Sequence, residues 1–178
     1  MKTSSYWSAQ ELVVLGVFAA AAKLSSVFIA LAGGGMNPIM LIIKNLIFTT
    51  LLVVFLTKVP KPGTLLLFTA VSMLVSTLLI GGSIALVPAA FIGALFAEAV
   101  LWATHGFRYW WGPLLATALY DLGSKGISLG VAYLFFRESP EIINVVVPVV
   151  LISYLGAIAG LYSGHKSVAE LKRAGFIR

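Results

Sequence analysis

The 178-residue sequence contains no cysteine and few charged residues. The absence of cysteine excludes disulfides, thiolate metal sites and cysteine nucleophiles. Charged residues make up 10% of the chain and hydrophobic residues 60%, whereas a soluble domain carries roughly 25% charged residues. The only histidines, His105 and His165, fall at predicted helix ends, so we expect neither a metal centre nor a cofactor. This composition predicts an all-α, polytopic membrane protein.

The sequence also lacks the motifs of common enzymes and of nucleotide hydrolysis. It has no His-Glu-x-x-His, no Gly-x-Ser-x-Gly and no Walker-type phosphate loop. We therefore predict that the chain has no catalytic residues, is not an enzyme and cannot power transport by itself. Its net charge of +6 marks the cytoplasmic loops of a membrane protein and does not indicate binding to nucleic acid.

Six apolar stretches are long enough to cross a bilayer, given a requirement of about 20 residues per helix. No polar segment is long enough for a separate soluble domain, so residues 1–178 are predicted to form one membrane domain. The first stretch is too long for the core of a signal peptide, and we expect it to remain as a helix. The predicted spans are Glu11–Ala32, Ile39–Thr57, Thr64–Ile80, Ile84–Thr104, Gly112–Phe136 and Ile142–Ser163.

The distribution of lysine and arginine predicts the orientation. If the N-terminus is inside, the outer loops hold Arg137 alone among the basic loop residues. Because basic residues collect on the cytoplasmic side, both termini are predicted to be cytoplasmic. The residues then placed inside are Lys2, Lys58, Lys61, Arg108, Lys166, Lys172, Arg173 and Arg178.

Charged residues within apolar helices are candidates for function, because each is costly without a partner. Asp121 and Lys125 are one helical turn apart, and Ser124 and Ser128 extend the same polar stripe. Such a stripe must face protein or water. Two interpretations remain open: the pair satisfies itself within the helix, or the stripe lines a ligand cavity open to the outside.

Other polar residues on the predicted outer side extend this candidate site. Lys44 either faces the same cavity or extends its ammonium group to the membrane surface. The candidate substrate-binding residues are Asp121, Lys125, Lys44, Asn37, Asn144, Tyr120 and Glu141.

The first helix combines small side chains with a lysine near its middle. Small residues three and four apart permit close approach of another helix, and at about 100° per residue they form two stripes. We expect the stripe of Ala19, Ala22 and Ser26 to meet a partner protein. The second stripe contains Gly16, Ala20 and Lys23, and we expect Lys23 to point into the bundle and to pair with Glu98 or Asp121.

Three short motifs carry a resemblance to a known family. They are Lys61-Pro62-Gly63 before the third span, Gly93 to Ala99 in the fourth, and Gly160 to Gly164 followed by Leu171 to Gly175 at the end. In order and spacing the chain resembles the substrate-binding S components of energy-coupling factor (ECF) vitamin transporters. Within that family it is most similar to the thiamine and hydroxymethylpyrimidine branch.

The resemblance implies a membrane-embedded subunit that binds a micronutrient in the cytoplasmic membrane of a bacterium or archaeon. The pocket would lie in the outer halves of the last three helices and the loops after the first and third. The subunit would dock through small residues of the first helix, among them Gly16, Ala19, Ala20, Ala22 and Ser26, onto a transmembrane coupling subunit driven by two cytoplasmic ATPases. It would then topple in the membrane to release its substrate.

The substrate and two other functional classes stay open. Thiamine is a cation, whereas Lys44 and Lys125 against Asp121 suit an anionic or zwitterionic ligand at least as well. A stand-alone channel or proton-linked carrier would use the same charges as a relay. A structural membrane protein would use its small residues only for packing between helices.

Overall fold

The computed structural model describes residues 6–33, 37–80, 87–135 and 140–177, and within them helices joined by turns and loops make up the chain. Six α-helices and a short 3₁₀ helix occur, and these residues contain no strand, which confirms the all-α prediction for them. The elements are α1 (Ala9–Gly33), α2 (Pro38–Lys58), α3 (Thr64–Ile80), α4 (Val87–Ala103), η2 (Gly106–Arg108), α5 (Gly112–Phe135) and α6 (Pro140–Arg173).

Local signals set the ends of the first helices close to where the sequence predicts them. Ser8 and Glu11 form a capping box at the start of α1: the Ser8 amide donates to Glu11 Oε2 at 2.8 Å, and the Glu11 amide donates to Ser8 Oγ at 3.2 Å. Asn37 caps α2 by accepting from the Ile39 amide at 3.0 Å, and Pro38 follows as the first helical residue.

The last helix is longer than predicted. The predicted span ends at Ser163, with a basic tail beyond it, but α6 continues to Arg173. Its end is a Schellman-type cap, in which the Gly175 amide donates to Lys172 and the Phe176 amide donates to Leu171. Gly175 supplies the positive φ of 76° that this cap requires. No proline follows Ser163, and Gly164 packs against Val53 of α2, so the helix can continue into the tail.

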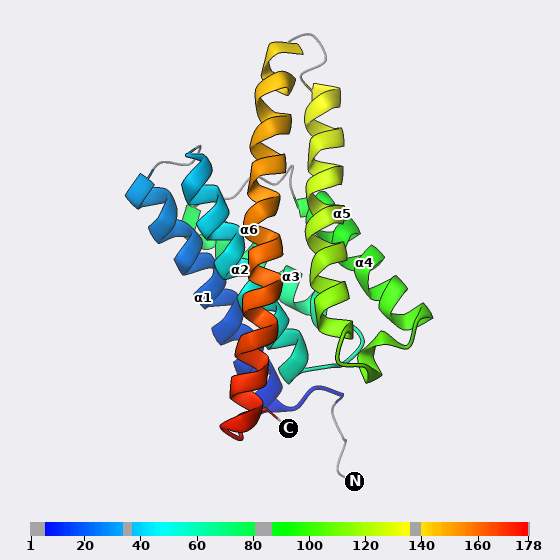
Figure 1. Ribbon diagram of the computed structural model, residues 1–178. Helices are drawn as coiled ribbons and strands as arrows, with labels where there is room; N and C mark the ends of the chain where they lie inside the picture. The colour runs from blue at the N-terminus through cyan, green and yellow to red at the C-terminus, as the bar shows by residue number, and fades with distance from the viewer. Residues whose placement is uncertain (1–5, 34–36, 81–86, 136–139, 178) are drawn as a thin grey trace.

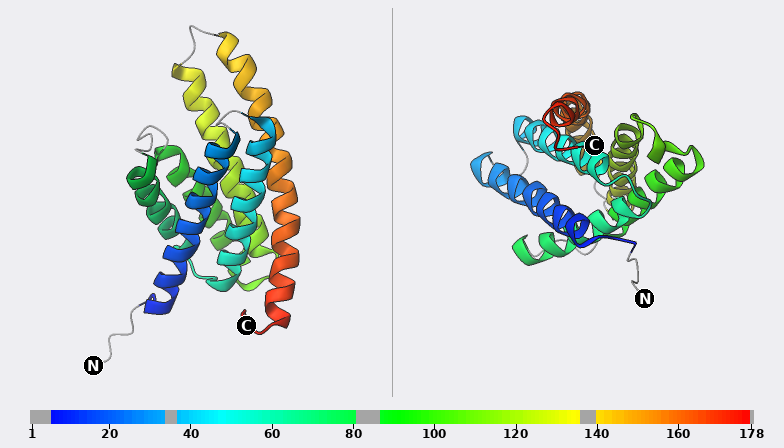
Figure 2. Two further views of the ribbon diagram at one scale, coloured as in Figure 1. Left: turned by 90° about the vertical axis from the view of Figure 1, so that its left-hand side faces the viewer. Right: turned by 90° about the horizontal axis from the view of Figure 1, so that it is seen from below.

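The helices form one bundle in which the first and last described residues lie at the same side (Figure 1). The Tyr6 hydroxyl donates to the carbonyl of Pro62 at 3.2 Å, and the Lys58 ammonium group donates to the carbonyl of Phe176. The beginning of α1 and the end of α6 therefore both contact the region between α2 and α3. At the opposite side, α5 and α6 extend beyond the other helices (Figures 1 and 2). The 34 residues of α6 measure about 51 Å at 1.5 Å per residue, longer than a bilayer core of about 30 Å.

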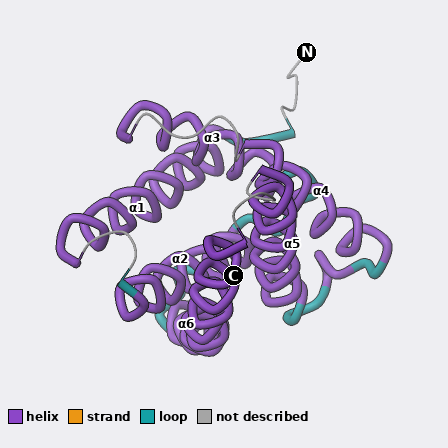
Figure 3. The backbone as a smooth tube through the Cα atoms, turned by 90° about the horizontal axis from the view of Figure 1, so that it is seen from above, coloured by secondary structure: helices purple, strands orange, loops and turns teal. Residues whose placement is uncertain are grey.

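Helices α2 and α6 lie side by side in the view along the bundle (Figure 3), and three glycines of α6 lie against α2. A Cβ on Gly160 would lie 2.7 Å from the Leu46 carbonyl oxygen, and one on Gly164 would lie 2.8 Å from the Val53 Cβ. Gly156 is similarly close to α2. These glycines, four residues apart, form a small-residue contact that permits van der Waals packing between membrane helices.

The described helices differ in how well they suit a bilayer. Helices α1 and α2 and the stretch Asn144–Arg173 are long and apolar enough to cross a membrane. The apolar stretches Thr64–Leu79 in α3 and Val87–Ala103 in α4 are shorter, and α5 carries the polar stripe. Of the predicted fourth span, the part before Val87 lies among residues outside the described ranges.

Candidate functional site

A cavity of about 230 Å³ lies among five helices, and several of the predicted residues line it. It sits beyond the midpoint of α1 and in the first half of α2, on the side away from the chain termini. Its lining comes from α1 to α5 and not from α6. The lining residues are Ala22, Lys23, Ser26, Lys44, Asn45, Phe48, Met73, Ala90, Tyr120, Asp121, Ser124 and Ser128.

Asp121 and Lys125 form an ion pair beside this cavity. Lys125 Nζ lies 2.7 Å from Asp121 Oδ2, one turn along α5, and the Asp121 side chain is only 7% exposed. Lys125 also lies 4.8 Å from the ring centre of Tyr154 on α6, a cation–π contact. The pair therefore forms within the helix, and Asp121 also lines the cavity; that the stripe binds a ligand from outside stays a prediction.

Two further lysines reach the cavity from other helices. Lys44 projects from α2 and Lys23 from α1. Lys44 lies within electrostatic range of both Lys23 and Lys125. Next to Lys44, the Asn45 amide donates to the Ser153 carbonyl on α6 at 3.0 Å and so helps to hold α2 in place. The cavity is thus lined by lysines from two helices, α1 and α2.

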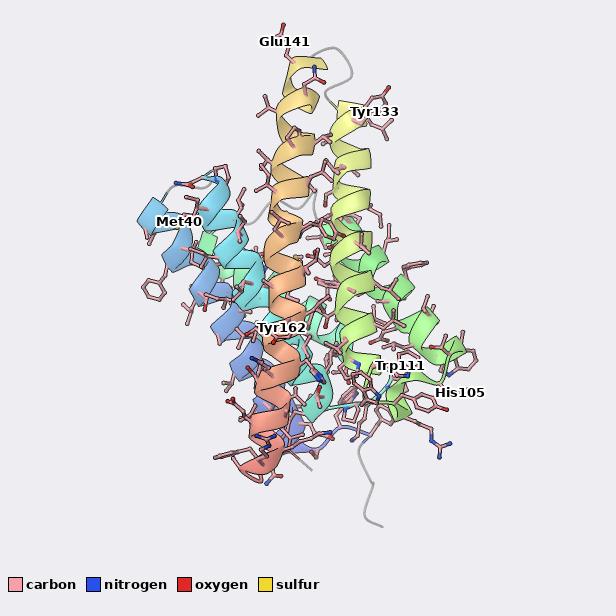
Figure 4. The ribbon with its side chains drawn as sticks, viewed as in Figure 1. Met40, His105, Trp111, Tyr133, Glu141 and Tyr162 are labelled. Atoms are coloured by element: carbon pink, nitrogen blue, oxygen red, sulfur yellow. The ribbon has the colours of Figure 1, made fainter. Side chains whose placement is uncertain are left out.

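Three of the predicted substrate-binding residues lie away from this cavity. Asn37 uses its side-chain oxygen as the N-cap of α2. Asn144 is exposed near the start of α6. Glu141 is exposed at the tip of α6, far above the ends of α1 and α2 (Figure 4). The extension of α6 beyond the bundle explains why its first residues do not reach a cavity lined by α1 to α5.

The sequence did not predict the apolar residues that line the cavity. Phe48, Met73 and Ala90 come from α2, α3 and α4, which have apolar residues on nearly every face, so no sequence signal separates them from lipid-facing neighbours. Tyr120, which was predicted, lies in the lining with its ring centre 6.2 Å from that of Phe48. These residues give the cavity aromatic and apolar lining in addition to its charges.

The predicted pair of Lys23 and Glu98 does not form. Glu98 instead accepts hydrogen bonds from the Gly63 amide at 2.9 Å, the Leu65 amide at 2.7 Å and the Leu66 amide at 3.1 Å. These are orphan amides at the start of α3, where a carboxylate also complements the helix dipole. The motif around Lys61-Pro62-Gly63 and the motif containing Glu98 therefore meet in space as a structural unit.

The predicted division of α1 into two faces is wrong for the stripe of Ala19, Ala22 and Ser26, which faces inward, whereas Lys23 lines the cavity within the bundle as expected. Ala19 and Ala22 are buried in the core, at 0% and 3% exposure, together with Leu15. Ser26 lies beside Lys23 in the cavity lining. A Cβ on Gly16 would meet nothing within 4 Å. Small residues suit internal and external helix contacts equally well, so their spacing could not decide which stripe faces out.

Comparisons with known proteins relate this chain to a family and to a solved structure. Residues 9–140 match the family described as "Hypothetical bacterial integral membrane protein (Trep_Strep)". The chain belongs to this family. A search of the curated proteins gave no match. Among solved structures, the Trep_Strep chain is similar to one described as "Crystal structure of an S-component of ECF transporter".

The structural similarity extends over most of both chains. It covers 95% of this chain and 87% of the other, with a TM-score of 0.61 and 23% sequence identity. At this identity the comparison concerns the fold. Together with the family and the apolar helices, it establishes a multi-pass membrane protein with the helical arrangement of that solved S component.

Proposed function

We propose that this chain is the substrate-binding S component of an ECF-type importer for a vitamin or a related micronutrient. The observation that supports it most is the cavity with charged lining residues inside a bundle of apolar helices. Ionisable side chains within a membrane protein mark ligand or ion pathways by default. The similarity of fold to a solved S component supports the same function.

In this proposal six helices cross the cytoplasmic membrane and both termini are cytoplasmic. The cavity then lies in the outer part of the bundle, because its residues on α1 and α2 are nearer the ends remote from the termini. Substrate enters from outside. The subunit works as a binding and transport component and not as an enzyme, and its partners are a transmembrane coupling subunit and two cytoplasmic ATPases.

The outward face of α1 is the proposed docking surface for the coupling subunit. Ala20 is half-buried and lies on the same face as the exposed Val13 and Val17, with Gly16 beside them. Small side chains there allow a partner helix to approach closely. We expect Ala20→Trp to spare substrate binding and to abolish uptake in cells. Ala19→Trp is the contrasting variant, because Ala19 is buried and a large side chain there should reduce the folded yield.

Affinity purification of the tagged chain from its native membrane tests the function. The expected result is co-elution of a coupling subunit and two ATPases, with uptake that depends on ATP. Transport by the purified chain alone in liposomes would instead establish a stand-alone channel or carrier. If the chain co-elutes with no partner and transports nothing, a structural role is the remaining interpretation.

The substrate first suggested by the family branch is thiamine or its pyrimidine precursor. Negative charge in the cavity would stabilise a cationic substrate, but Asp121, the one carboxylate that lines it within the described ranges, is already paired with Lys125. The charges of the cavity therefore disfavour thiamine itself as the substrate.

A further inference from the structure

The charges around the cavity do not balance. Among the described residues, Asp121 is the single acidic residue of the lining, and its carboxylate is bound to Lys125 at 2.7 Å. That pair is close to neutral as a unit. Lys23 and Lys44 remain, on two different helices, and both line the same cavity.

Neither of these two lysines has a counter-charge in the described part of the chain. The ion pairs found there are Lys61 with Glu11 and Lys125 with Asp121, and no hydrogen bond involves the ammonium group of Lys23 or Lys44. Glu98, the other carboxylate within an apolar helix, is occupied by three amides of α3. Two like charges facing one cavity repel each other and favour the approach of an anion.

We propose that the cavity binds an anionic substrate, whose carboxylate or phosphate group lies between the ammonium groups of Lys23 and Lys44. This inference rests on the proposed function and specifies the chemical class of its substrate. The remainder of the ligand contacts the apolar wall of Phe48, Met73 and Tyr120. A volume of about 230 Å³ is smaller than the roughly 300–1,000 Å³ of sites for drug-sized ligands. The cavity therefore suits a compact acid of one ring or a short chain.

Mass spectrometry of compounds that co-purify with the full-length chain tests this inference. We expect a compound with a net negative charge at neutral pH to be enriched with the wild-type protein over a mock purification. Its amount per folded protein should fall at least tenfold in Lys44→Met and further in the double variant Lys23→Met/Lys44→Met. Lys44→Arg keeps the charge and should retain most of the compound.

Lys166→Met is the matched control for removal of a lysine. Lys166 lies near the C-terminal end of α6, with its ammonium group 5.0 Å from the ring centre of Tyr162, and does not line the cavity. This variant should retain the compound in full. Because the Lys44 side chain is exposed, Lys44→Met opens no gap in the core, and gel filtration of each variant checks that it is folded.

Thermal unfolding with charge-matched probes gives a second measurement. The probes are a one-ring acid and its amide, nicotinate and nicotinamide, with thiamine as the cation. Stabilisation by an acid but not by its amide, lost in Lys44→Met, would support the inference.

Each other outcome overturns it. Enrichment of a cation or of a neutral compound would refute the anionic substrate and leave the proposed function intact. An anion that Lys23→Met/Lys44→Met retains would refute the role of the two lysines. If no compound is enriched and no probe stabilises the protein, both the inference and the binding function fail.

Discussion

Glu98 and Lys23 are both charged side chains within apolar helices, but their surroundings are opposite. Glu98 binds three backbone amides and joins α4 to the start of α3. Lys23 lines the cavity without a counter-charge in the described residues, and Lys44 shares this situation. A charge that is fully satisfied by the fold contributes to its stability, whereas an unsatisfied one costs free energy and indicates a role in binding.

Two ion pairs of the molecule, one near the termini and one beside the cavity, differ in their exposure to solvent. Lys61 bonds to Glu11 at 2.7 Å with both side chains partly exposed, and its ammonium group also donates to the Tyr6 carbonyl at 3.0 Å. Lys125 bonds to Asp121 at the same distance but is more deeply buried. The two pairs therefore have equal N–O distances but different interaction energies, because water and salt screen the more exposed pair.

The largest expected effect follows from Lys125→Met. It leaves the buried Asp121 carboxylate without its partner, which should lower the free energy of unfolding by about 3 kcal/mol. Unfolding in detergent measures the loss. The double variant Asp121→Asn/Lys125→Met removes both charges and should recover most of the stability. A double variant as unstable as Lys125→Met would show that the ion pair is not the cause.

Glu98→Ala is next in expected size. It leaves three amides at the start of α3 without an acceptor and should cost about 2 kcal/mol. Glu98→Gln retains a side-chain carbonyl and should lose less than half as much. Thermal unfolding measures both variants, and ligand bound per folded protein should not change. An unchanged melting temperature for Glu98→Ala would remove the structural role assigned to this residue.

Lys23→Met should change the stability in the opposite direction to Glu98→Ala. Removing an unpaired charge from an apolar helix should raise the stability of the ligand-free protein by about 1 kcal/mol. The same variant should weaken ligand binding. The melting temperature should rise in Lys23→Met and fall in Glu98→Met, and measuring both variants tests the difference between the two charges. A fall of similar size for both variants would mean that Lys23 is satisfied by the fold.

Lys61→Met should give the smallest change. The pair with Glu11 is partly exposed, so its loss should cost about 0.5 kcal/mol. Raising the salt concentration should weaken the wild-type pair and reduce the difference between the two proteins. A loss as large as that of Lys125→Met would indicate that the contacts of Lys61 near the start of α1 are stronger than their exposure implies.

Much of the secondary structure was predictable because its signals are local. Apolar length, the Ser8 capping box, Asn37-Pro38 and Gly63 mark helix ends within a few residues of where they occur. The polar stripe of α5 was likewise visible as Asp121, Lys125 and their neighbouring serines. The extension of α6 to Arg173 was missed because a charged sequence after an apolar span resembles a tail.

The composition of the site was predicted only in part. Asp121, Tyr120 and Lys44 line the cavity, whereas Asn37, Asn144 and Glu141 lie away from it. Polar residues in loops and at helix ends resemble ligand-binding residues in a sequence, although many of them cap a helix or face solvent. Their distance from the cavity depends on the lengths and positions of α2 and α6 in the bundle.

The sequence by itself determined that this protein is an all-helical membrane protein with charges embedded in its helices, because composition and local patterns are sufficient for both conclusions. Only the tertiary structure decided that Ala19 and Ala22 face the core, that Glu98 caps α3, and that Lys23 and Lys44 meet at one cavity. The rotation of each helix about its axis fixes these contacts. In helices that are apolar on nearly every face, packing between helices sets that rotation, and no periodicity in the sequence reveals it.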